Sequence, residues 1–189
     1  MNYTDLSICS NALLKLGAES ITSYKDGTAE AEIASSLYPL IRDSLLSSYP
    51  WKFAVAQKKL QRLADSPIAD YRYAYLLPNN FLRVISAGEG GRGQGITYAI
   101  NENRLHTDKS EVTLTYIFRP PESLFPAFFC EALVAKLAAE FCLPLTESTS
   151  RAEMLAKISD DLVAKARLID AQQATPSCFE DYTLVEARK

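Results

Sequence analysis

The stretch Tyr49-Pro50-Trp51-Lys52-Phe53-Ala54 divides the chain into two patterns of apolar spacing. Before it, apolar side chains recur every three or four residues, which is typical of helices. After it they alternate, which is typical of strands. Pro50 fixes its own φ and disfavours the helical region for the residue before it, so a helix should end here. Trp51 and Phe53 carry large rings that can be buried where helix meets strand.

Two helices are predicted on the N-terminal side of this stretch. The first spans residues 4–16, with Thr4 as a suitable N-cap and Gly17 as a suitable C-terminal stop. The second begins after Thr28 and continues to the stretch at 49–54. Pro39 lies inside its apolar pattern, so we expect a kink or a split there.

On the C-terminal side, residues 52–119 alternate in short runs separated by turn residues. Runs of this length predict an antiparallel meander of about four or five strands. The runs are 53–63, 71–75, 81–87, 96–100 and 112–118.

After Pro126 the spacing becomes helical again. One helix, apolar nearly all round, is expected to end at Pro144. A second helix starts at the capping-box sequence Ser150-Arg151-Ala152-Glu153 and runs to about residue 173. Its apolar side chains share one predicted face: Met154, Ile158, Leu162 and Ile169.

These patterns together predict an α+β fold with an antiparallel β insertion. Residues 1–51 and 120–174 form a helical bundle from both chain ends, and residues 52–119 form the β insertion. Residues 175–189 form an extended C-terminal tail, which we call the arm.

Composition excludes several classes of protein. Hydrophobic residues make up 48% of the chain, so it folds, and the net charge of −3 lacks the basic excess of a DNA-coating protein. The sequence has no signal-peptide pattern at its N-terminus and no run of about 18 apolar residues. We therefore expect that the chain does not span a membrane. We also expect that it is made in a cytoplasm.

The cysteines do not predict a metal site or a disulfide framework. Four cysteines are widely spaced, no CxxC pair occurs, and the chain has a single histidine. Cys9, Cys130 and Cys142 fall in apolar helical stretches, where we expect reduced core thiols.

Residues 88–95 are rich in glycine and match the dinucleotide-binding pattern GxGxxG. That pattern needs a helix directly after its last glycine to hold the pyrophosphate, and here a strand-like run follows. No cofactor is expected. We predict a mobile loop between two strands that contacts a neighbouring subunit, through Gly88, Gly90, Gly91, Arg92 and Gly93.

No catalytic constellation is evident, and we do not expect an enzyme. His106 stands alone beside a turn, and no nucleophile motif accompanies it. The carboxylate pairs at 30 and 32 and at 160 and 161 lie on helices, where such neighbours do not face each other.

Three alternating tyrosines admit two interpretations. Tyr71, Tyr73 and Tyr75 would share one face of a strand and could stack on nucleic-acid bases. Basic residues are sparse between them, which favours packing in the core of a sheet.

One ordered series of residues resembles the tail tubular protein A family of short-tailed phages and related head-to-tail adaptors. It covers roughly residues 6–84, and beyond them only the layout is similar. The series comprises Asn11-Ala12-Leu13-Leu14, Leu16-Gly17-Ala18, Asp26-Gly27-Thr28, Arg42-Asp43, Tyr49-Pro50-Trp51 with Phe53-Ala54, Tyr71-Arg72-Tyr73-Ala74-Tyr75, Leu77-Pro78 and Phe81-Leu82-Arg83-Val84.

The resemblance implies a virion structural protein located in the neck or tail and made in the cytoplasm of a bacterial host. Such adaptors form a ring, commonly a dodecamer, beneath the portal protein and present a surface to the next tail component. DNA passes through their channel without specific binding. In this reading Pro50, Trp51, Phe53 and the three tyrosines are structural motif residues that mark a fold.

The arm carries four apolar residues that are costly to leave in water: Phe179, Tyr182, Leu184 and Val185. The arm either packs back on its own helices or docks on the portal or an adjacent subunit. The family resemblance favours docking.

Two other functions remain open. A tail module that binds a ligand or a host surface would need a concave apolar pocket in the sheet. A hydrolase would need carboxylates that converge in a cleft.

Overall fold

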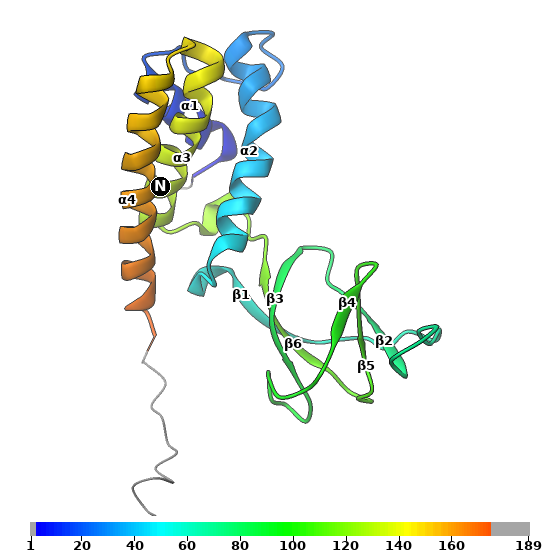
Figure 1. Ribbon diagram of the computed structural model, residues 1–189. Coiled ribbons are helices and arrows are strands. Elements are labelled where there is room, and N and C mark those ends of the chain that lie inside the picture. The colour runs from blue at the N-terminus through cyan, green and yellow to red at the C-terminus, as the bar shows by residue number, and fades with distance from the viewer. Residues whose placement is uncertain (1–2, 175–189) are drawn as a thin grey trace, which may run out of the picture.

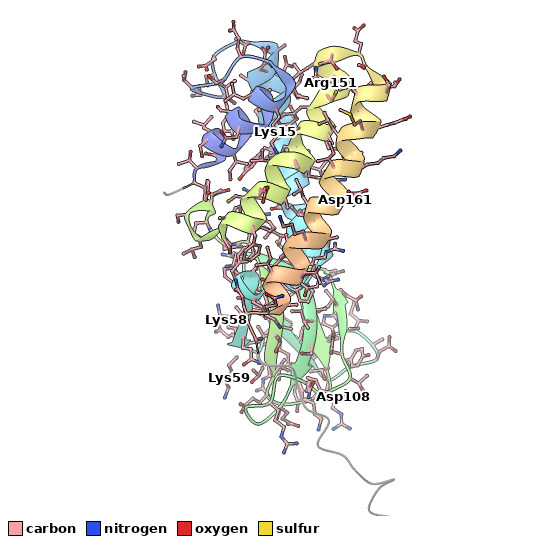
Figure 2. All side chains as sticks on the ribbon, turned by 90° about the vertical axis from the view of Figure 1, so that its left-hand side faces the viewer. Lys15, Lys58, Lys59, Asp108, Arg151 and Asp161 are labelled. Carbon is pink, nitrogen blue, oxygen red and sulfur yellow. The ribbon has the colours of Figure 1, made fainter. Side chains whose placement is uncertain are left out.

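The computed structural model describes residues 3–174, and the arm lies outside them. The molecule has two parts, a helical bundle and a β part that projects from one end of it, as two perpendicular views show (Figure 1 and Figure 2). The bundle combines the first two helices with the last two, so it is built from both ends of the chain. The predicted α+β class and the antiparallel β insertion are confirmed.

Four helices form the bundle: α1 (Asp5–Leu16), α2 (Ala29–Ser48), α3 (Ala127–Thr146) and α4 (Thr149–Ala171). The most buried is α3, which packs against the other three, with α2 and α4 flanking it (Figure 1). Its sequence is apolar on nearly every side because each side meets another helix.

The predicted start and stop signals of the first two helices are confirmed. Thr4 caps α1, and its side chain and that of Ser7 form reciprocal hydrogen bonds. Gly17 ends α1 in the left-handed conformation at φ 74°, which glycine adopts without a Cβ clash. Thr28 caps α2 by accepting a hydrogen bond from the Ala31 N–H at 3.2 Å.

Two predicted helix boundaries are wrong, and the split considered at Pro39 does not occur. Pro39 does not split α2, which runs on to Ser48, and Pro144 does not end α3, which continues to Thr146. A proline removes only one backbone hydrogen bond, and packing against neighbouring helices can offset that loss. Because Glu147 takes the left-handed conformation and closes α3, the cap of α4 is Ser148 rather than Ser150.

The apolar stripe predicted on α4 is not the face that the helix buries most. Met154 is 54% exposed and Ile158 is 46% exposed. The helix instead buries its narrower side chains against α3: Ser159, Val163, Ala166 and Asp170. Narrow side chains allow two helices to pack closely. The face that carries them is therefore turned inward, and the larger apolar stripe is left partly exposed.

The β part holds two three-stranded antiparallel sheets. One has the order β1-β6-β3 and the other β2-β5-β4, so the predicted simple meander is wrong. The strands are β1 (Val55–Lys59), β2 (Tyr73–Leu76), β3 (Phe81–Gly88), β4 (Ala99–Asn101), β5 (Arg104–Thr107) and β6 (Thr113–Phe118).

Two local features explain the difference in strands. The run predicted at 53–63 begins with a 3₁₀ turn, η1 (Lys52–Ala54), and its strand ends at Lys59. Strand β5 was not predicted because its hairpin with β4 turns at Glu102 and Asn103, which have φ values of 50° and 60°. Turns of this kind usually carry Asn-Gly or Asp-Gly, and that signal is missing here.

The molecule has two hydrophobic cores. The larger lies in the bundle and extends to Trp51, Ala54 and Ile117 at the start of the sheets. The smaller lies between the sheets, around Tyr75, Leu105 and Leu114. Each part therefore has its own apolar interior, and the first core reaches across to hold the second part.

The three described cysteines confirm the prediction for the core. Cys9, Cys130 and Cys142 are buried and form no disulfide with each other. Burial raises the pKa of the Cys9 thiol to about 11 and that of Cys130 to about 12, so both stay protonated near neutral pH.

A substitution at Phe129 tests whether α3 is the central helix of the bundle. Phe129→Ala should lower the free energy of unfolding by about 3–5 kcal/mol, because it opens a cavity at a fully buried site. Leu143→Ala is the control, since Leu143 lies on the same helix and is 50% exposed. It should change stability by less than about 1 kcal/mol. Guanidinium unfolding measures both, and equal losses would contradict the assignment.

Candidate functional site: the junction between bundle and sheets

The predicted motif residues lie where the bundle meets the β part. Tyr49 leaves the helical region, with φ −147° and ψ 145°, and so ends α2 before Pro50. Trp51 is fully buried, and its indole N–H donates a hydrogen bond to the Leu45 carbonyl at 3.0 Å. That bond satisfies one of the carbonyls that the end of a helix leaves free.

Trp51 and Phe53 belong to an aromatic cluster that spans the junction. Ring centroids of Trp51 and Phe129 are 5.1 Å apart, and those of Phe53 and Phe129 are 4.9 Å apart. Tyr49 and Phe125 complete the cluster at 5.1 Å from Trp51 and 5.0 Å from Phe129. These pairs meet edge to face, the geometry that aromatic quadrupoles favour.

Asp170, at the end of α4, is the polar anchor of the junction. It is fully buried, and its two carboxylate oxygens accept the Lys52 backbone N–H at 3.1 and 3.0 Å. Lys52 is the first residue of η1, whose N–H groups would otherwise lack partners. Burial raises the pKa of Asp170, while the hydrogen bond and charge of Lys52 oppose that rise.

A charged network fixes the second crossing of the chain. Arg42 on α2 bonds Asp43 at 2.9 Å and Glu122 at 3.0 Å, and Asp43 also pairs with Arg119. Arg119 directly follows β6, and Glu122 starts the short helix η2 (Glu122–Leu124). Burial favours protonation of Asp43, yet hydrogen bonds from Arg119 and Arg42 hold its pKa below the usual range.

Both crossings between the two parts are therefore bonded to the bundle. The first is held by Asp170 and the aromatic cluster, and the second by Arg42 and Asp43. The arrangement can set the direction in which the β part projects, which is a mechanical role.

The glycine-rich segment lies between β3 and β4, as predicted, but it is attached to the first sheet. The Gly93 carbonyl accepts hydrogen bonds from Ser86 Oγ at 2.6 Å and Thr115 Oγ1 at 3.3 Å. A Cβ at Gly88 would overlap the Arg92 carbonyl. Gly90 and Gly91 have positive φ, which explains these glycines in the turn. Mobility of the loop stays a prediction.

The three tyrosines do not form a shared platform. Tyr71 precedes β2 rather than lying in it, so it has no place on the strand face. Tyr75 is 1% exposed and donates its hydroxyl hydrogen to the Lys109 carbonyl at 2.7 Å. Tyr73 packs beside this core, under Arg62. Core packing is therefore the role of Tyr73 and Tyr75.

The predicted docking residues of the arm, Phe179, Tyr182, Leu184 and Val185, lie outside the described residues. The structure therefore does not test where the arm lies.

His106 lies in β5, at a hollow of about 330 Å³ that Ser66 and Asp70 also line. A catalytic triad needs hydrogen bonds from nucleophile to base and from base to acid. Within residues 3–174, no side-chain hydrogen bond joins any two of these three residues. The three side chains are therefore not linked as a triad in this structure.

Glu140 and Asp160 meet in a groove between α2 and α4, each 3.9 Å from Lys136 Nζ. Their side chains are 51% and 75% exposed. Both carboxylates are thus open to solvent and lie beside the same ammonium group. Across the described part of the chain, no three His, Cys, Asp or Glu side chains are grouped to hold a metal ion.

Sequence reasoning missed Asp170 and the groove. The signal for Asp170 was its spacing, since residues 159, 163, 166 and 170 repeat at three or four along α4. That face combines Ser, Val, Ala and Asp and is less apolar than the stripe at 154, 158, 162 and 169. Apolar spacing alone therefore points to the stripe instead.

Comparison with known proteins adds no relative: no protein-family model matches the sequence, and no curated protein matches it. Among the described helices, none is long and apolar enough to cross a membrane.

The buried carboxylate of Asp170 predicts a specific pH dependence. Its folded-state pKa is raised, so the folded protein binds this proton more tightly than the unfolded chain does. The free energy of unfolding should therefore fall as pH rises from about 4, the ordinary value for Asp, through the higher folded value. Asp170→Asn should abolish this fall, measured by denaturant unfolding at a series of pH values.

Asp43→Asn is the matched control with the opposite sign. The pKa of Asp43 is lowered, so its contribution is present above the ordinary value and is lost as pH falls through the folded one. The variant should flatten the acid side of the stability profile. Identical profiles for the two variants would contradict the assignment of Asp170.

Proposed function

We propose that this protein is a virion structural protein, a head-to-tail adaptor. In this role it forms a ring beneath the portal, with twelve copies as the family resemblance implies, and extends the DNA channel to the next tail component. The observation that carries the proposal is the position of Pro50, Trp51 and Phe53, the most telling residues of the resemblance, at the junction.

A junction of this kind suits an adaptor. A ring subunit must present one surface to the portal and another to the tail, and the angle between them must be fixed. In this protein the two crossings are held by the Asp170–Lys52 hydrogen bonds and by the Arg42–Asp43–Arg119 network. The motif residues Pro50, Trp51 and Phe53 have a structural role at this junction, as an adaptor motif would.

The charge of the chain supports passage of DNA rather than a grip on it. The net charge is −3, so the chain lacks the overall basic excess that draws a DNA-coating protein to phosphates. A channel wall through which DNA slides has no use for such binding.

The two alternatives gain no support from the described residues. The hollow over the first sheet is lined by polar groups, including Gln57, Ser86 and Thr115, rather than by an apolar floor. The carboxylates that converge, Glu140 and Asp160, are exposed and share a lysine. Neither a ligand-binding module nor a hydrolase is therefore favoured.

Deletion of residues 175–189 tests the arm. The shortened protein should remain folded and soluble, because the core lies within residues 3–174, yet it should no longer join portal-bearing heads. Circular dichroism checks folding, and co-sedimentation with heads checks attachment. Attachment that survives the deletion, or a chain that fails to fold, would show that the arm is not a docking element.

A matched pair of full-length variants separates the contribution of the arm's apolar side chains from that of the charged side chains between them. Changing Phe179, Tyr182, Leu184 and Val185 to Ser should abolish attachment, since these side chains supply the apolar contact. Neutralising Glu180, Asp181 and Glu186 with amides should weaken it far less, because rim charges contribute little to affinity.

The free protein should be monomeric or weakly associated, with ring formation templated by the portal. Rings that formed freely would compete with ordered assembly on the head. Multi-angle light scattering at micromolar concentration tests this, and a stable dodecamer there would refute templating.

A further inference from the structure

A groove of about 450 Å³ lies between α2 and α4, over α3. Ile41, Leu45 and Val163 give it apolar walls, and Leu40 on its rim is 68% exposed. A leucine so exposed beside buried apolar neighbours makes a surface that gains free energy when covered.

The two ends of the groove carry different charges. At the end nearer the β part, Arg167 donates to Ser48 Oγ at 3.2 Å and lies over the Tyr49 ring, and it has no ion pair within residues 3–174. At the other end are Glu140 and Asp160, which share Lys136. The groove is thus positive at the end near the β part, where Arg167 lies, and acidic at the end where Glu140 and Asp160 lie.

The chain itself supplies a segment of matching chemistry. Helix α4 ends at Ala171, one turn beyond Arg167, and fifteen residues follow the described part of the chain. Five residues lead from Ala174 to Phe179 and can span up to about 17 Å. Arg167 lies about 10 Å back along the helix axis from Ala174, so the chain is long enough to reverse and bring Phe179 to the groove.

The order of charges in the arm mirrors that of the groove. Glu180 and Asp181 come first, then Tyr182, Leu184 and Val185, then the single acid Glu186, and finally Arg188 and Lys189. A chain that turns back after α4 must run antiparallel to it. In that direction the acidic pair meets Arg167, the apolar residues meet Leu40 and Leu45, and the basic pair meets Glu140 and Asp160.

The dimensions agree as well. From Arg167 to Asp160 the groove follows α4 for about 10 Å. The eight steps from Glu180 to Arg188 cover between about 12 Å in a helix and about 26 Å in a strand. The helical length matches the groove, whereas an extended chain would carry Arg188 about 16 Å past Asp160, so the charge register favours the helical conformation.

We propose that in the free protein residues 175–189 occupy the α2–α4 groove of their own chain, antiparallel to α4. The groove shelters the apolar residues of the arm. Because the arm is tethered, its effective concentration at the groove is on the order of millimolar, so docking does not require a second copy. The role of the arm on portal-bearing heads rests on the proposed function, whereas docking in the groove does not.

Limited proteolysis of the full chain tests the docking. Chymotrypsin cleaves after Phe179 and Tyr182 only when the arm is released, and mass spectrometry identifies those fragments. Leu40→Asp should speed this cleavage by about tenfold or more, because it places a charge where an apolar side chain is covered. Leu168→Asp is the matched control: Leu168 is 67% exposed and lies outside the groove, and the rate should be unchanged.

A charge swap gives a second, independent test. Arg167→Glu should also speed cleavage, and Glu180→Arg with Asp181→Arg in the same chain should restore the slow rate. Melting temperatures show that each variant folds. Equal rates in wild type, Leu40→Asp and Leu168→Asp overturn the proposal, as does a swap without rescue. Protection that falls on dilution assigns the groove to the arm of another copy and overturns docking within one chain.

Discussion

The bond between the Asp170 carboxylate and the Lys52 N–H connects the last helix to the point where the chain leaves the bundle. A buried carboxylate is stable only when its oxygens accept hydrogen bonds, and the start of a 3₁₀ turn offers an N–H with no other partner. The end of α4 is thereby held beside Trp51, whose ring packs on Phe129. This contact therefore fixes the start of the β part against the end of the bundle's last helix.

Much of this architecture could be predicted from local chemistry. Thr4, Gly17 and Thr28 signal helix ends by mechanisms that need no distant partner, and the change of spacing at Trp51 marks the change from helix to sheet. The failures have a common cause, since they depend on distant partners. Ile158 is more apolar than Ser159, yet the close approach of α4 to α3 buries the serine. Strand order likewise follows from packing of the sheets, which no single run of residues encodes.

The residues of the candidate site also fall into two groups, those that local sequence predicts and those that depend on distant partners. Pro50, Trp51 and Phe53 were identified from sequence because large aromatic residues beside a proline signal burial at an element boundary. Asp170 and Lys52 are 118 positions apart in sequence, and Asp43 and Arg119 are 76 apart, so no pattern within one segment reveals these contacts. What unites them is the task of holding two independently packed parts at one angle, which is the property that the proposed adaptor role requires.

The pairing of β1 with β6 has a consequence for how such a chain can evolve. These strands carry the chain into and out of the β part, and Val55 lies opposite Ile117 in their ladder. Directly opposite residues in an antiparallel pair lie about 5 Å apart, so the chain enters and leaves the β part side by side. Strand β3 also touches the bundle, since Leu82 packs against its core. The second sheet, β2-β5-β4, lies beyond these contacts, so changes in its length would leave the β1–β6 pair and the helices where they are.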